Sequence, residues 1–167
     1  MDITLVGPGR AGMAVAIAAV AAGHTITGVR GRSTAATESA AAAVGATPLT
    51  GESLGSGDLL VIAVRDDQIE PVSRELAPHS SGFSAAVHLS GLAPTTVLSP
   101  FAASGLAVGS FHPLQTLPTP EAGAAAIPGA WIGVTAQQPL RDKLHALADS
   151  MAAHPFDLPD EAKALYH

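Results

Sequence analysis

The sequence predicts an α/β domain built on a doubly wound, mostly parallel sheet. Three observations lead to this expectation. Apolar segments of strand length alternate along the chain with small-residue or amphipathic helical segments. The strand expected over residues 58–64 is a nearly continuous apolar run, as in a strand buried on both faces of a parallel sheet. A glycine-rich turn lies between the first strand and the first helix.

That turn has the spacing of a dinucleotide-binding fingerprint. An apolar strand at residues 3–6 leads into it, and a helix follows that carries Met13, Ile17 and Val20 on one face. The first glycine permits the tight turn, the second leaves room for a pyrophosphate, and the third lets the helix pack closely on the sheet. The free N–H groups of the helix then face the phosphates. The six residues expected to contact the cofactor are Gly7, Pro8, Gly9, Arg10, Ala11 and Gly12.

We therefore expect a Rossmann unit with strand order 3-2-1-4-5-6 and extra strands after the sixth. The alternative is a glycine-rich turn in some other α/β protein. Further elements are expected over residues 24–29 (strand), 33–44 (helix), 46–49 (edge strand or turn), 51–57 (loop, with or without a helical turn), 83–91 (strand and its exit), 94–103 (helix), 106–116 (strand and its exit), 118–128 (loop with a short helix), 130–134 (strand), 137–153 (helix), 154–158 (strand) and 159–167 (start of a helix, capped by Asp160 or a neighbour).

A basic corner follows the second strand. An NAD-preferring site usually has Asp or Glu here, to accept hydrogen bonds from the ribose 2′-hydroxyl. This chain has Arg30 and Arg32, followed by Ser33 and Thr34. Guanidinium groups and hydroxyls suit a 2′-phosphate, which favours NADP over NAD. The alternative is a solvated Arg pair beside a Ser or Thr that only caps the next helix, and Arg30 can point either way from the strand end.

The fourth strand ends in a charged loop that crosses the cofactor in a Rossmann domain. Val64 and Arg65 stand there, and Arg65 contacts either the pyrophosphate, an acidic substrate or only solvent. Asp66 or Asp67 is expected to cap the following helix.

Candidate catalytic groups follow the fifth and sixth strands, at the edge where open α/β sheets bind ligands. Ser90 is either a site residue or part of a turn, and His88 is a weaker candidate that also fits the core. His112 precedes Pro113, which keeps it extended. It is either a proton-exchanging group or a structural histidine at a strand end.

Composition excludes several classes of function. The chain has 167 residues, enough for one domain, and its net charge of −6 gives no general attraction to nucleic acid or an anionic membrane. It has no cysteine, which excludes disulfides, Cys-ligated metals and thiol catalysis, and its seven histidines are scattered without metal-ligand spacing. Without a membrane-length apolar stretch or a basic signal-peptide start, we expect a soluble cytoplasmic protein with no metal.

These parts suit hydride transfer between NADP(H) and a C=O or C=N carbon. His112 is the candidate acid/base, and Ser90 would orient the substrate or polarise its carbonyl. A hydrolase is rejected, because Gly109-Ser110 lacks the second glycine of a nucleophile elbow and lies inside a strand. A non-catalytic NADP(H)-binding sensor or regulatory module is the rival from another class.

Several motifs in order carry a family resemblance. They are Gly7 to Gly12, Gly28 to Ser33, Val64 to Asp67, His88 to Gly91, Gly109 to Thr116 and Lys163 to His167. The set resembles a bacterial family that joins a Rossmann-like NADP-binding domain to a helical C-terminal domain. Wider relatives are similar to pyrroline-carboxylate reductase, ketopantoate reductase, 6-phosphogluconate dehydrogenase and prephenate dehydrogenase.

The resemblance implies more than the residues alone do. His112-Pro113 and Ser90 match the catalytic His-Pro and the neighbouring Ser of prephenate dehydrogenases, whereas Arg65 stands where relatives often have Pro. Residues 1–158 would be the NADP-binding domain and 159–167 the start of a truncated helical domain. That helical domain would supply much of the substrate pocket and the interface of a homodimer. The substrate would be a small keto or imino acid, with a ketopantoate-type reduction as one example.

Overall fold

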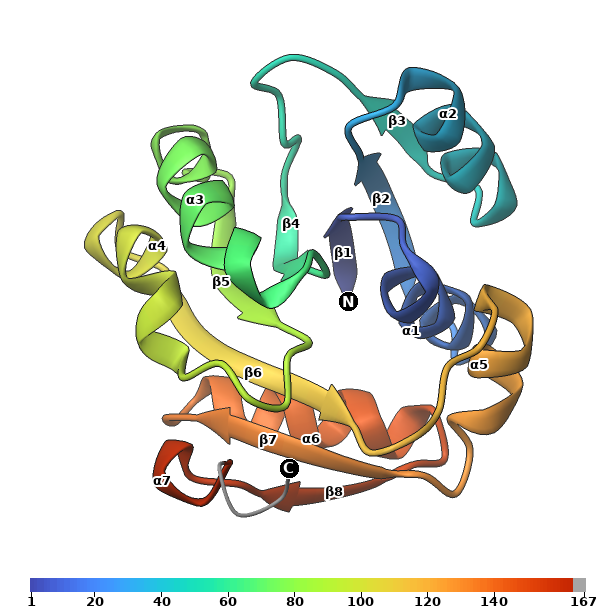
Figure 1. Ribbon diagram of the computed structural model, residues 1–167, viewed down its shortest axis with the longest axis vertical. Helices are drawn as coiled ribbons and strands as arrows, with labels where there is room; N and C mark the ends of the chain where they lie inside the picture. The colour runs from blue at the N-terminus through green and yellow to red at the C-terminus, as the bar shows by residue number, and fades with distance from the viewer. Residues whose placement is uncertain (164–167) are drawn as a thin grey trace.

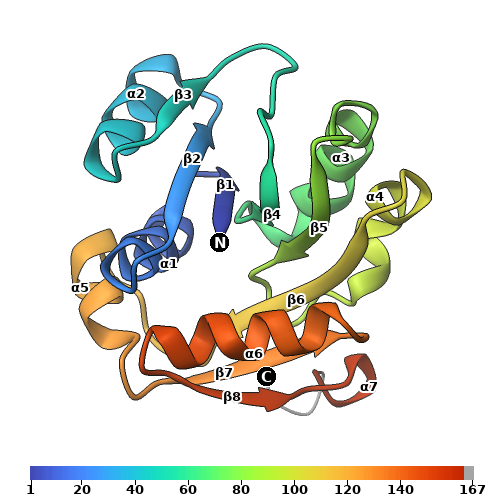
Figure 2. The ribbon, with the colours of Figure 1, turned by 180° about the vertical axis from the view of Figure 1, so that it is seen from behind.

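An eight-stranded sheet runs through the molecule, in a computed structural model that describes residues 1–163 (Figures 1 and 2). Its strand order is β3-β2-β1-β4-β5-β6-β7-β8. The strands are β1 (Asp2–Val6), β2 (Thr25–Arg30), β3 (Thr47–Leu49), β4 (Gly57–Ile62), β5 (Phe83–His88), β6 (Ala107–Pro113), β7 (Trp131–Ala136) and β8 (His154–Asp157). The helices are α1 (Arg10–Ala21), α2 (Thr34–Ala43), α3 (Asp66–Leu76), α4 (Ser99–Ala103), α5 (Pro120–Ala126), α6 (Leu140–Ser150) and α7 (Asp160–Lys163), with short 3₁₀ helices η1 (Ala77–His79) and η2 (Thr95–Leu98).

The predicted fold class and strand order are confirmed. The first six strands are all parallel, in the order 3-2-1-4-5-6. Beyond β6 the chain turns back through α5, which packs against α1, so β7 is antiparallel to β6. A second crossover through α6 makes β8 parallel to β7. These are the extra strands that the sequence predicts.

Helices cover both faces of the sheet, so the central strands are buried on both sides. Helices α1, α5 and α6 lie on one face, and α3 and α4 lie on the other (Figures 1 and 2). In β4, Leu59 and Val61 belong to the first core, while Leu60 and Ile62 belong to the second. This double burial is the physical reason for the apolar run in that strand.

Some local expectations are wrong. Neither Asp66 nor Asp67 caps α3: Arg65 is the N-cap, and both carboxylates lie in the first turn, where they favour the positive end of the helix. Asp160 likewise is the first residue of α7 rather than its cap. In α1, Met13 is buried, but Val20, expected on the same helical face, is exposed.

Two expected helices differ in extent. Residues 94–103 form η2 and then the short α4, which has a proline in its first turn, where a missing N–H has no helical acceptor. The helix expected over 137–153 spans only Leu140–Ser150. The first turn of the expected 159–167 helix is α7, and residues 164–167 lie outside the described part of the chain.

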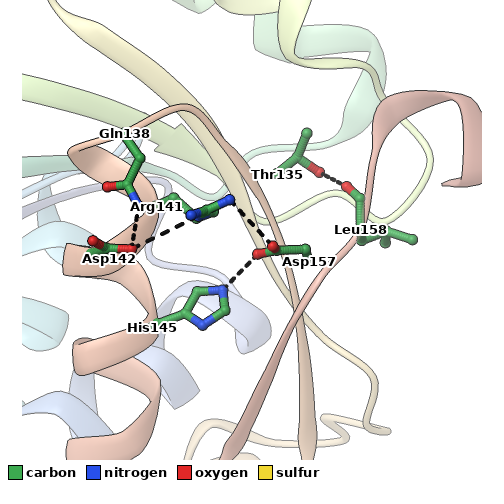
Figure 3. A network of polar contacts seen from close by, with 7 residues as sticks. All are labelled: Thr135, Gln138, Arg141, Asp142, His145, Asp157 and Leu158. Carbon is green, nitrogen blue, oxygen red and sulfur yellow. Dashed lines mark hydrogen bonds and ion pairs between the residues drawn. The ribbon is translucent and has the colours of Figure 1, made fainter.

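A surface network ties α6 to the edge strand (Figure 3). Nε2 of His145 lies 2.8 Å from Oδ1 of Asp157, and Arg141 reaches Oδ2 of the same carboxylate at 3.5 Å. The hydroxyl of Thr135 in β7 donates to the carbonyl of Leu158. The network holds α6 against β8 at the end of the sheet that lies far from β1.

Among residues 1–163, no helix has both the length and the apolar character that a membrane crossing requires.

Candidate functional site

The turn between β1 and α1 leaves no space for a side chain at two of its glycines. Gly7 has a φ of +94°, and a Cβ on it would lie 2.6 Å from the carbonyl oxygen of Ala63. A Cβ on Gly12 would lie 2.5 Å from the carbonyl oxygen of Gly7. Such distances would force backbone to move, so both positions require glycine. The missing side chains let α1 pack directly on the sheet.

Gly9 is open where its neighbours are crowded. It is the N-cap of α1, and no atom lies within 4 Å of its Cβ position. The N–H of Met13 donates to the carbonyl of Gly9 at 2.9 Å, so the N–H groups of Arg10, Ala11 and Gly12 precede the helical ladder. No acidic residue lies in this first turn. Open space before a positive helix end fits a pyrophosphate.

The end of β2 lies against this turn. The N–H of Gly7 donates to the carbonyl of Arg30 at 2.9 Å, and a Cβ on Gly31 would lie 3.0 Å from the ring of Pro8. The structure thus brings the basic corner and the glycine turn together. The Arg30 side chain, however, is only 17% exposed and pairs with Glu75 of α3 at 2.8 Å. Of the two directions open to it, Arg30 takes the one toward α3.

The next two residues of the corner behave differently from Arg30. Arg32 is exposed and makes no ion pair with any residue between 1 and 163, so it can meet a phosphate without displacing a carboxylate. Ser33 caps α2, because its Oγ accepts from the N–H of Ala36 at 3.4 Å. The capping alternative therefore describes Ser33 in this structure, although a hydroxyl that accepts can still donate.

Val64 and Arg65 follow β4. Val64 is half-buried, and its Cγ1 lies 2.9 Å from the Cβ position of Gly7, so it packs against the glycine turn. The Arg65 side chain is 83% exposed and pairs with Asp67, with nitrogen–oxygen distances of 3.2 Å. Arg65 therefore lies in solvent in this structure, and its contact with a pyrophosphate or an acidic substrate stays a prediction.

His112 lies at the carboxyl end of β6 and is held in a defined orientation. Its Nδ1 lies 2.9 Å from the carbonyl oxygen of Leu89, just after β5. Since a carbonyl can only accept, Nδ1 carries the proton in this arrangement, and Nε2 is the nitrogen that can take up or release one. The ring is half-buried.

Ser90 directly follows the residue that orients His112. Its Oγ accepts from the N–H of Leu92 at 3.1 Å and from the N–H of Ala93 at 2.9 Å. Ser90 therefore forms the turn after β5, which was one of its two alternatives. The same bonds hold its hydroxyl in place beside the carbonyl that binds His112, so the structure brings the two candidates onto neighbouring loops.

His88 is a core residue rather than part of this open edge. It is 0% exposed, and neither ring nitrogen makes a hydrogen bond of ordinary geometry with the described residues. Burial and, to a lesser extent, the nearby Lys163 ammonium lower the pKa of the ring to about 4, against smaller raising effects of the Pro94 carbonyl, Asp160 and Asp66. His88 is therefore neutral at pH 7.

One concave region lies toward the opposite end of β6 from His112. A groove of about 710 Å³ has Val108 at the start of β6 and Thr135 near the end of β7 in its lining, together with Thr95, Arg141, Asp157 and Asp160. It faces the amino end of β6, whereas His112 lies at the carboxyl end. The candidate site is therefore defined by the glycine turn and the later strand ends.

Sequence reasoning missed two parts of the site. The close approach of Gly31 to Pro8 has a weak signal, a glycine directly after a strand. The role of Leu89 has none, because it is the backbone carbonyl that orients His112. The partner of Arg30 is also set by folding, since Glu75 lies forty-five residues away and no local pattern marks it.

A sequence profile of the Rossmann-like domain matches residues 1–113. This chain belongs to the Rossmann-like domain family. The predicted family resemblance is thereby confirmed. A search of curated protein sequences found no match.

Solved structures of dehydrogenases and reductases share the fold of this Rossmann-like protein. An arogenate dehydrogenase from Synechocystis has a TM-score of 0.81 at 18% identity, with 98% of this chain and 61% of that chain covered. A prephenate dehydrogenase from A. aeolicus in complex with NAD⁺ has a TM-score of 0.75 at 13% identity, covering 98% and 61%. An imine reductase from Myxococcus stipitatus in complex with NADP⁺ has a TM-score of 0.76 at 19% identity, covering 99% and 58%. The chain thus spans about three fifths of the length of these structures.

The buried His88 predicts a pH-dependent stability. Its pKa is about 4 in the folded chain and 6.5 as a free side chain, so between these values the unfolded chain binds the proton and the folded chain does not. Stability should therefore fall as the pH drops from 7 toward 4. Between pH 7 and 4.5 we expect the free energy of urea unfolding of the wild type to fall by about 2–3 kcal/mol more than that of His88→Leu.

His24 adds the same sign of pH dependence, because burial and the charged N-terminus lower its pKa. It is present in both proteins, so the difference between them isolates His88. An unchanged slope in His88→Leu would show that His88 is not the responsible group.

Proposed function

We propose that this domain binds NADP(H) and takes part in hydride transfer to or from a small keto/hydroxy or imino acid. The observation that carries the proposal is the contrast within the glycine turn. Backbone atoms leave no room for a Cβ on Gly7 or Gly12, whereas the Cβ position of Gly9 is open and lies at the positive end of α1. That shape and charge are those required by a pyrophosphate, and His112 lies at the same edge of the sheet.

Residues of the glycine turn and of the loop after β4 would contact a bound dinucleotide. The N–H groups of Arg10, Ala11 and Gly12 would hold the pyrophosphate, with Pro8 shaping the turn. Val64 would pack beside it, and Arg65 would have to leave Asp67 to reach it. When bound, the nicotinamide supplies or accepts the hydride.

NADP rather than NAD is favoured by the corner after β2. Arg32 is an exposed cation that pairs with no described carboxylate, and Ser33 stands next to it. Arg30 would contribute mainly through the electrostatic field of its charge, since its guanidinium already forms an ion pair with Glu75. No acidic residue occurs from Arg30 to Ser33 to bind a ribose 2′-hydroxyl in the NAD manner. One similar structure contains NADP⁺ and another NAD⁺, so the fold itself does not decide between them.

His112 would hold and transfer the proton that accompanies reduction. With Nδ1 bonded to the Leu89 carbonyl, protonated Nε2 would donate to the developing alkoxide or amine, and neutral Nε2 would accept in the reverse direction. Ser90 would donate its hydroxyl hydrogen to the substrate while its oxygen keeps the two backbone bonds. The keto- or imino-acid class, including a ketopantoate-type reduction, is supported by family resemblance and by the similarity to an imine reductase.

The assembly and location belong to the same proposal. We propose a homodimer for a form that carries a helical C-terminal domain, of which α7 would be the first turn after a domain of residues 1–158. We also propose a cytoplasmic location, which fits the absence of cysteine and would give access to the cellular NADPH pool.

A non-catalytic NADP(H) sensor is the second candidate. The Ser90 turn favours it, because two backbone N–H groups explain the serine without any substrate. A sensor would bind the cofactor and show no turnover with keto or imino acids.

Gly9→Val should separate binding from folding. The Cβ position of Gly9 is open and its φ is −82°, so the side chain fits the folded chain at a cost of about 1 kcal/mol as a poor N-cap. The same side chain would occupy the space of the pyrophosphate. Fluorescence titration should show NADPH affinity reduced by at least about tenfold, while thermal unfolding stays close to wild type. Unchanged affinity in a folded variant would place the dinucleotide elsewhere.

Arg32→Ala should identify the cofactor. Loss of a charge-assisted phosphate contact should weaken NADPH binding by roughly ten- to a hundredfold and leave NADH binding nearly unchanged. The matched control is Arg74→Ala, since Arg74 is also exposed but pairs with Glu70 on α3. Equal weakening of NADPH and NADH, or no effect on either, would contradict the assignment of Arg32 to a 2′-phosphate.

His112→Asn should test catalysis with the local structure kept. The Asn amide can still donate to the Leu89 carbonyl, but it cannot exchange a proton near neutral pH. With a substrate drawn from a panel of keto and imino acids, kcat should fall by about 10²–10⁴ while NADPH affinity is retained. An unimpaired kcat would remove His112 from the chemistry, and a wild type without turnover on the whole panel would favour the sensor.

A further inference from the structure

A lysine of α7 is buried against the loop that carries Ser90. The side chain of Lys163 is 1% exposed, and its Nζ donates to the carbonyl of Ala93 at 2.9 Å. The same Nζ lies 2.8 Å from Oδ1 of Asp160. A buried ammonium is costly unless it is paired and hydrogen-bonded, and here it has a carboxylate and a carbonyl.

Asp160 holds the other end of the same short segment. Its Oδ2 accepts from the N–H of Thr95 at 3.0 Å and from the hydroxyl of Thr95 at 2.7 Å. Burial alone would raise the pKa of Asp160, but the hydrogen bonds from Lys163 and Thr95 outweigh it and lower the pKa. The first turn of α7 therefore holds the backbone at both Ala93 and Thr95 through one ion pair.

Ala93 links this ion pair directly to Ser90. Its carbonyl accepts from Lys163, and its N–H donates to Oγ of Ser90 at 2.9 Å. On the other side of Ser90, the carbonyl of Leu89 accepts from Nδ1 of His112. A continuous series of contacts thus leads from α7 to both candidate catalytic groups, and it spans only residues 89–95 of the intervening chain.

We propose that Lys163 and Asp160 are positioning residues, which clamp the segment Ser90–Thr95 and thereby set the Ser90 hydroxyl and the Leu89 carbonyl that orients His112. For its effect on turnover this inference rests on the proposed function. The structural part of the inference, that α7 holds this loop in one geometry, does not rest on the proposed function.

The energetics favour positioning over simple stabilisation. A buried ion pair is often no more stable than apolar side chains of similar volume, because desolvation offsets the attraction. Its directional bonds, in contrast, specify one arrangement of the groups they join. Among residues 1–163, the hydrogen bonds that Lys163 and Asp160 make outside α7 go to Ala93 and Thr95.

Lys163→Met is the decisive variant, because it keeps the length of the stem and removes the charge and the donor. NMR without cofactor or substrate would measure amide hydrogen exchange of Leu92 and Ala93 and the ring resonances of His112. We expect exchange at both amides to rise at least tenfold and the His112 ring signals to shift. In turnover assays, kcat should fall at least tenfold with the KM for NADPH within twofold of wild type.

Two controls separate this effect from general loss of stability. Lys143→Met removes the other lysine of the chain, which is exposed on α6, and should leave every readout unchanged. Leu144→Ala opens a cavity under α6 and lowers the global stability of the chain. It should nevertheless leave amide exchange at Leu92 and Ala93 and the His112 ring signals as in wild type. If Lys163→Met behaves like either control, the positioning proposal is wrong.

A milder variant keeps the proposal testable if Lys163→Met does not fold. Thr95→Val removes only the hydroxyl bond to Asp160 and should shift the same amides and ring signals in the same direction by a smaller amount. The NMR response is independent of NADPH binding. A shifted loop in a chain that binds no dinucleotide would therefore refute the proposed function alone, and an unshifted loop in a chain that binds NADPH would refute the clamp alone.

Discussion

The direct contact between α1 and the sheet is the constraint on which the candidate site depends. Gly7 and Gly12 allow it, since a side chain at either position would collide with backbone within 3 Å. Because α1 then starts at the carboxyl edge of the sheet, its unpaired N–H groups face the same edge as the ends of β4, β5 and β6. Cofactor and catalytic candidates therefore share one edge as a consequence of packing.

The sheet could be predicted because its signals are local. Glycine spacing, apolar runs of strand length and small-residue helices each lie within a dozen residues, and together they specify a parallel, doubly wound order. The helix caps were predicted less well. Asp66 and Asp67 have the chemistry of caps, but the chain enters α3 at Arg65, and the carboxylates stabilise the first turn through the helix dipole instead.

Charged side chains near the site could not be assigned from the sequence, because distant residues decide their partners. The sequence leaves open which way Arg30 points from the strand end, and Glu75, forty-five residues away, decides it by pairing with Arg30, whereas Arg32 makes no ion pair among residues 1–163. Lys163 gives no local sign that its ammonium is buried, since its contact to Ala93 spans seventy residues. Similar structures at 13–19% identity share the fold of this chain, but a shared fold does not show which of its charged residues form ion pairs.

The two halves of the candidate site are held by different parts of the chain. The glycine turn is held by close packing: Gly7 lies against Ala63 after β4, and its N–H donates to the carbonyl of Arg30 in β2. The segment that carries Ser90 packs through the buried Leu89 and Ala93, and it is also held by hydrogen bonds to His112 on one side and to α7 on the other. Under the proposed function, cofactor binding depends on the sheet and α1, whereas the orientation of His112 depends on the segment that α7 holds.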